Sequence, residues 1–90
     1  MHHHHRAAVV TITLASAGDV ALGTAFGVAD RIGVADGLYF AVTTATTVGY
    51  GDITPRGWLA HILAVMMMLL IIPLFAATFS LLTSGLTSTA

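Results

Sequence analysis

The sequence contains no cysteine and no lysine, and charged residues make up only 8% of it against 57% hydrophobic residues. The absence of cysteine excludes thiolate metal sites and gives no indication of redox compartment. Charge this sparse does not cover the surface of a soluble monomer, which exposes most of its Lys, Arg, Asp and Glu. Four acidic residues nearly balance three arginines, so no basic patch is available to bind nucleic acid. The composition therefore indicates a membrane protein.

Residues 1–5 stand apart from the rest of the chain. The four histidines directly after Met1 are typical of an engineered affinity tag, and a tag carries no information about the fold. A native histidine-rich tract that binds metal is the alternative interpretation. Ninety residues allow one small domain at most, so we expect residues 6–90 to form a single domain.

The first apolar segment, about 7–29, is long enough to span a membrane, which takes about 20 residues. Ala, Gly, Ser and Thr dominate it, and small residues let helices approach closely, so we expect this helix to pack against protein. Asp19 lies near its middle, where a carboxylate costs about 2.5–3.5 kcal/mol unless it is paired, protonated or hydrated. The residue is either a proton- or ion-sensing site or a group that faces protein or interfacial water.

A cleavable signal peptide is the competing interpretation of this segment. Arg6, the apolar run 7–14 and the small residues 15–17 match the charged, apolar and cleavage regions of such a peptide. The apolar character resumes after Asp19 and continues to Val28, which favours a complete membrane crossing.

The segment that follows is too short to span. A polar break from Asp30 to Gly37 holds the only cluster of charges, so we expect it at an aqueous interface, with Asp36 as the cap of the next helix. A helix over about 37–46 would be about 15 Å long, half the thickness of the hydrocarbon layer. A re-entrant helix that enters and leaves on the same side is the natural solution.

Residues 47–51 then have to return to the surface as irregular backbone, which survives at membrane depth only inside protein or beside a wet cavity. Glycine at 49 and 51 adopts φ > 0 at little cost. In an ordinary strand, successive carbonyls point to opposite sides. If left-handed and right-handed backbone conformations alternate, successive carbonyls point to the same side. A single row of such oxygens would be unsatisfied. Four copies facing one axis could share desolvated cations, which indicates an oligomer.

Residues 44–52, Thr-Ala-Thr-Thr-Val-Gly-Tyr-Gly-Asp, match the potassium-channel signature T-x-T-T-V-G-Y-G-D at every specified position. The chain therefore resembles a prokaryotic potassium-channel pore domain, whose carbonyl filter is a known device. The resemblance implies an all-α membrane protein that forms a homotetramer around a central pore in the lipid bilayer. Its parts would be an outer helix (about 7–29), a re-entrant pore helix (about 37–46), a selectivity filter (47–51) and an inner helix (about 58–84).

The resemblance also implies the ion ligands. The carbonyls of Thr47, Val48, Gly49 and Tyr50, with the Thr47 hydroxyl, would bind permeant K⁺, and Gly51 would complete the filter. No other cofactor is expected.

Four residues would support the filter from behind. The ring of Tyr50 is expected to be held by Tyr39 and Phe40, which stand where many relatives carry two tryptophans. Asp52 matches an acid behind the filter, whose partner in some relatives is a glutamate at the place of Thr43. A threonine cannot share a proton in that way, so we expect the Tyr39 hydroxyl to donate to Asp52.

The inner helix begins at Trp58, which fits an interfacial anchor. The glycine hinge of the family would fall at Ile71 and is absent. Pro73 removes a backbone hydrogen bond and is the candidate substitute. The gate is then expected below it, with Thr78 as its first residue.

The resemblance places the protein in the cell membrane as a multi-pass protein with both termini in the cytoplasm. Arg6 then lies inside while Arg31 and Arg56 lie outside, against the positive-inside bias. No regularly spaced arginines indicate a voltage sensor. A sensor before Arg6 or a cytoplasmic regulatory domain after Ala90 would lie outside this sequence.

Other functions fit less well. An enzyme would need a nucleophile with a base or a metal cluster, and His61 is the only histidine outside the tag. His61 itself is interpreted as a packing or interfacial residue, with pH sensing as the alternative. A weakly selective cation channel of the same architecture is the closer rival, and Tyr50 argues against it.

Overall fold

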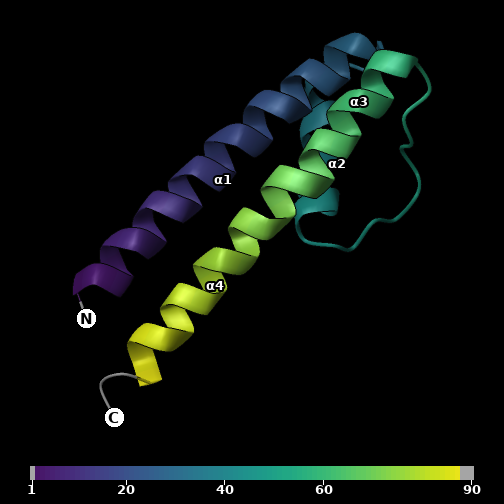
Figure 1. Cartoon of the computed structure of the whole chain (residues 1–90). Helices are drawn as coiled ribbons and strands as arrows, with labels where there is room; N and C mark the ends of the chain where they lie inside the picture. Colours follow the sequence, from purple (N-terminus) through teal and green to yellow (C-terminus); the bar gives the residue numbers. More distant parts are fainter. Residues whose placement is uncertain (1, 88–90) are drawn as a thin grey trace.

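The computed structural model describes residues 2–87, with side chains from residue 5 to residue 86. Within that range every regular element is helical, and two long helices run antiparallel with a short helix beside them (Figure 1). The molecule measures 49 × 20 × 19 Å. The elements are α1 (His2–Ala29), α2 (Val34–Ala45) and a continuous inner helix made of α3 (Trp58–Met66), the π-helical turn η1 (Met67–Ile71) and α4 (Ile72–Thr87).

Two stretches of the described residues are long and apolar enough to cross a membrane. They are His5–Ala29 in α1 and Trp58–Leu86 in the inner helix. Both cover the ranges expected from the sequence, although α1 begins earlier, within the histidine run, and the inner helix ends later. The all-α membrane fold is therefore confirmed.

The pore helix α2 begins three residues before the expected position, at Val34 instead of residue 37. The prediction that Asp36 caps it is wrong, because the cap is Gly33 at φ 94° and no side chain caps the helix. The Gly27 carbonyl accepts from the N–H groups of Ile32 and Gly33 at 3.0 and 3.2 Å. These bonds form the turn between α1 and α2, so α2 begins before Asp36. Asp36 lies in the first turn instead, where a negative charge still complements the helix dipole.

Helices α1 and α2 touch backbone to backbone through glycine. A Cβ atom added at Gly37 would lie 2.2 Å from the Gly23 carbonyl oxygen and 2.7 Å from the Gly27 Cα atom. A Cβ atom added at Gly23 would lie 2.7 Å from the Ala41 Cβ atom. Small residues four apart on both helices create this approach, as the small-residue composition of the first segment predicts.

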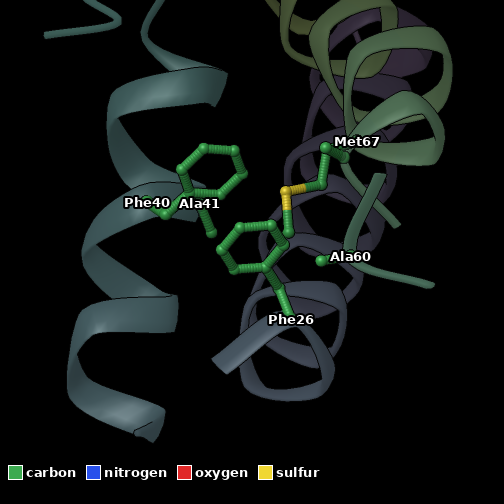
Figure 2. Close-up of a cluster of buried hydrophobic side chains, with 6 residues drawn as sticks. Phe26, Phe40, Ala41, Ala60 and Met67 are labelled. Carbon is green, nitrogen blue, oxygen red and sulfur yellow. The ribbon is translucent and has the colours of Figure 1, made fainter. Parts of the chain in front are cut away.

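The core lies where α1, α2 and the inner helix meet. Phe26 of α1 and Phe40 of α2 stack with ring centroids 4.1 Å apart and planes inclined by 4°. Figure 2 shows the Met67 side chain directed toward this pair, with Ala60 close by. Phe26 and Met67 are fully buried. One aromatic pair and one flexible side chain therefore join all three helices.

Gly37→Ala should destabilise the fold, because the added methyl group would have to push the two backbones apart. Overpacking of this kind costs about 1–3 kcal/mol. Gly57→Ala is the matched control, because its added Cβ atom meets only an Asp30 oxygen at an ordinary 3.5 Å. Thermal unfolding in detergent micelles measures both, and equal midpoints for the two variants would contradict the close approach.

Candidate functional site

The backbone that follows α2 adopts a left-handed conformation at every second residue. Thr47, Gly49 and Gly51 have φ of 64°, 55° and 79°, while the residues between them have no positive φ. The Gly49 N–H group donates to the Thr43 carbonyl at 3.0 Å and ties this segment to the last turn of α2. Alternation was expected at the two glycines, and the structure extends it by one step to Thr47.

Thr47 is a feature that sequence reasoning missed. A β-branched residue in the left-handed region is an outlier, and such strain costs about 1–3 kcal/mol and concentrates at functional sites. The available signal was positional: the residue just past a helix C-terminus commonly adopts the left-handed conformation, and Thr47 follows the C-cap residue Thr46. The absence of glycine there hid the signal.

The side chains of Val48 and Tyr50 have little cover within one chain. Val48 is 54% exposed and Tyr50 is 71% exposed. A Cβ atom added at Gly49 or Gly51 would meet nothing within 4 Å, so these two glycines are required by backbone conformation and not by space.

The expected bond behind the filter is present. The Tyr39 hydroxyl donates to Asp52 Oδ2 at 2.7 Å, and the Ile53 N–H group donates to Asp52 Oδ1 at 3.1 Å. The bond to the Asp52 carboxylate raises the pKa of Tyr39 above its ordinary value, because it favours the protonated phenol. Asp52 therefore links the end of the filter segment to α2.

Thr43 supports the segment through its main chain. Its hydroxyl donates back to the Phe40 carbonyl at 3.0 Å, and its carbonyl accepts from Gly49. Because the Thr43 side chain is buried and occupied, Tyr39 alone supplies the side-chain link from α2 to Asp52 that the structure shows.

Phe40 packs on α1 and also lines a concavity together with Thr47 and Gly49. Its ring is stacked on Phe26 and only 7% of the residue is exposed, which leaves little surface for the Tyr50 ring. The reason is the antiparallel pairing of α1 and α2, which turns this position of α2 toward α1. The expected contact of Phe40 with the Tyr50 ring stays a prediction.

Asp30 anchors the far end of the return loop, a role that the sequence did not reveal. Its carboxylate accepts from the backbone N–H groups of Arg56 at 2.8 Å and Gly57 at 2.9 Å. The Arg56 guanidinium donates to the Asp30 carbonyl at 2.9 Å. These bonds to Gly57 and then Arg56 hold the pKa of Asp30 below its ordinary value. The carboxylate thus fixes the backbone directly before the inner helix, from a position 27 residues earlier in the chain.

His61 lies one turn into the inner helix, near this anchor. Its Nδ1 atom lies 2.8 Å from the Gly57 carbonyl oxygen, and the side chain is exposed. This placement agrees with an interfacial residue.

The inner helix has one face packed on α1 and another that is exposed. Thr78 is 5% exposed and shares a 2.8 Å hydrogen bond with Thr11, so its side chain faces α1. Its place at the gate stays a prediction. Phe79, the next residue, is 74% exposed. A concavity lies between the end of α2 and the face of the inner helix that carries Phe79. Its lining residues are Ala45, Thr46, Thr47, Ile72, Phe75, Ala76 and Phe79.

The irregular turn η1 directly precedes Pro73. The Ile72 N–H group bonds the Met67 carbonyl five residues back, instead of the usual four. Proline has no N–H group, so the ordinary hydrogen-bond ladder is broken at two successive positions. The π-helical turn ends at Ile71, the position at which the family's hinge glycine was expected.

Tyr39→Phe should weaken the filter segment, because it leaves the Asp52 oxygen without its donor from α2. We expect faster loss of ion flux during sustained conduction, at unchanged helix content. The raised pKa means that this contribution to stability is complete below about pH 10 and is lost as pH rises through the folded-state value. Flux from proteoliposomes and circular dichroism measure the two quantities, and an unchanged flux time course would remove the bond from any functional role.

Asp30→Asn should lower the thermal midpoint at neutral pH. The carboxylate accepts one N–H group at each of its two oxygens, whereas an amide has only one oxygen. The lowered pKa means that the wild-type advantage is present above about pH 4 and disappears as pH falls through the folded-state value. Asp36→Asn is the control, since Asp36 is exposed. Equal midpoints for the two variants at neutral pH would contradict the anchor.

Comparison with known proteins identifies the family. A family model described as an ion channel matches residues 7–88. Human potassium voltage-gated channel subfamily KQT member 4 is 47% identical over 51 residues, which are 57% of this chain and 7% of the relative. Two-pore potassium channel 3 of Arabidopsis thaliana is 47% identical over 36 residues, 40% of this chain and 8% of the relative.

Chicken potassium channel subfamily T member 1 is 38% identical over 48 residues, 50% of this chain and 4% of the relative. The chain thus spans less than a tenth of the length of these relatives. No solved structure gives a significant match. The family model covers both long helices, α2 and the segment between them, and on that match the chain belongs to the ion channel family.

Proposed function

We propose that this chain is the pore of a potassium-selective channel, which conducts K⁺ passively through a filter of backbone carbonyls at 47–51. The observation that carries the proposal is the left-handed backbone at Thr47, Gly49 and Gly51, at alternate positions of the filter segment. This alternation brings the carbonyls of Thr47, Val48, Gly49 and Tyr50 to one side. Carbonyl oxygens in rings replace the hydration shell of K⁺.

A homotetramer supplies the rest of each ion site. One chain contributes one row of oxygens, and four rows around an axis give about eight oxygens to each ion. The distribution of exposure supports this assembly: the side of the inner helix that faces α1 is buried, while Phe79 and Leu86 are 74% and 75% exposed. Val48 and Tyr50 are likewise uncovered in one chain. Neighbouring copies are the cover that we propose for these residues.

The arrangement supports a multi-pass topology in the cell membrane with both termini in the cytoplasm. Helix α1 starts and the inner helix ends at the same end of the molecule, and the return loop rises to the opposite end (Figure 1). Asp52 would then lie at the outer mouth, and the C-terminal end of α2 would point to the central cavity. That end carries about half a negative charge, which favours a cation there.

The hinge and the gate are proposed at the inner helix. The turn Met67–Ile71 and Pro73 form the hinge, because the helix is irregular there. In the gate region that begins at Thr78, Phe79 is the proposed gate residue, because it shares a concavity with Thr46 and Thr47 at the base of the filter. Rings of such apolar side chains close pores by dewetting.

Ion flux from proteoliposomes tests the function. Flux with K⁺ should greatly exceed flux with Na⁺, and Gly49→Ala should abolish it, because alanine is strained at φ 55°. Gly57→Ala, at φ −88°, is the matched control and should conduct normally. Equal K⁺ and Na⁺ flux would favour the weakly selective cation channel, and no flux from a correctly assembled oligomer would overturn both functions.

A further inference from the structure

Asp19 is a buried carboxyl group that neither the fold nor the proposed filter uses. It is 6% exposed, and its Oδ1 atom has no hydrogen-bond partner among the described residues. The other three carboxyl side chains differ: Asp30 and Asp52 accept backbone and side-chain donors, and Asp36 is exposed. Asp19 alone lies inside a span long enough to cross the membrane.

Three elements meet beside Asp19. The adjacent residue Gly18 contacts η1, since a Cβ atom there would lie 3.0 Å from Ile71 Cδ1. The antiparallel register places Gly23 against Ala41 of α2. One turn further along both helices, the same register sets Asp19 opposite the last turn of α2. The residue therefore lies at the junction of α1, the base of the filter and the proposed hinge.

This junction disfavours a negative charge. An ionised carboxylate that is buried without a partner is strongly unfavourable. The C-terminal end of α2 adds repulsion, because it carries the negative end of the helix dipole. A protonated carboxyl group instead supplies one O–H donor, and the broken ladder at η1 and Pro73 leaves main-chain oxygens in need of donors.

No charged group balances Asp19 in the part of the chain that the structure describes. On α2, Asp36 is exposed and Tyr39 bonds Asp52. On α3, His61 is exposed and bonds the Gly57 carbonyl. The described side chains of η1 and α4 include no titratable group.

We propose that Asp19 is a proton-binding site that is occupied while α1, α2 and η1 are packed together, and that loss of its proton loosens this junction and alters conduction. The consequence for conduction rests on the proposed channel function. The proton site itself does not, so the two can be tested separately.

Infrared spectroscopy of the reconstituted protein tests the proton site. The chain has only four acidic side chains, all aspartates, so the carbonyl stretch of a protonated carboxyl can be assigned by substitution. We expect this band at neutral pH in the wild type and in Asp36→Asn, its loss in Asp19→Asn, and its disappearance from the wild type in alkali. A wild type without the band at neutral pH, or a band retained by Asp19→Asn, would overturn the proposal.

Potassium flux against pH tests the coupling. Over the range in which the band disappears, wild-type flux should change at least about tenfold, the ratio that 1.4 kcal/mol produces. Asp19→Asn should show a flat profile over the same range, at the level of the protonated wild type, while Asp36→Asn should follow the wild type. A profile that Asp19→Asn leaves unchanged would overturn the coupling. The band without flux in any variant would support the proton site and contradict the proposed channel function.

Discussion

The contact of α1 with α2 at Gly23, Gly27 and Gly37 is the interaction on which the rest of the structure depends. A helix of twelve residues cannot cross a bilayer, so α2 needs another helix to hold it at depth. In an apolar surrounding, the hydrophobic effect gives little reason for two helices to associate, and close packing of small residues takes its place. Once α2 is seated in this way, its C-terminal end and the filter segment that follows are placed as well.

The segment that follows α2 is then held by polar bonds at Gly49, Asp52 and Arg56. The Thr43 carbonyl binds Gly49 at the base, the Tyr39 hydroxyl binds Asp52 near the top, and Asp30 binds the backbone just beyond. Each bond joins the loop to a helix that is already packed. This distribution explains how a segment with strained backbone at Thr47 persists, because the surroundings over-determine its conformation.

The inner helix combines a packed side with an uncovered side. Toward α1 it presents buried residues such as Met67 and Thr78, and on another face it presents Phe79 beside the base of the filter. The π-helical turn lies between the segment packed on the core and the segment that leads to Phe79. The proposed hinge lies in that turn, and the proposed proton site at Asp19 of α1 lies beside it, because the adjacent Gly18 contacts Ile71.

The sequence by itself determined much of this protein. Sparse charge and two long apolar runs indicated the membrane, the ten-residue helix length indicated re-entry, and the spacing of Gly49 and Gly51 indicated alternating backbone hand. Even the bond from Tyr39 to Asp52 could be predicted, because resemblance to a family supplied the juxtaposition and the chemistry of phenol and carboxylate supplied the bond. Only the tertiary structure decided that Phe40 stacks on Phe26, that Asp30 binds the Gly57 N–H group 27 residues away, and that Thr78 faces α1 while Phe79 does not. The physical reason is that length, composition and glycine conformation are local properties of the chain, whereas these pairings depend on the relative rotation and height of packed helices, which the close approach at Gly37 sets.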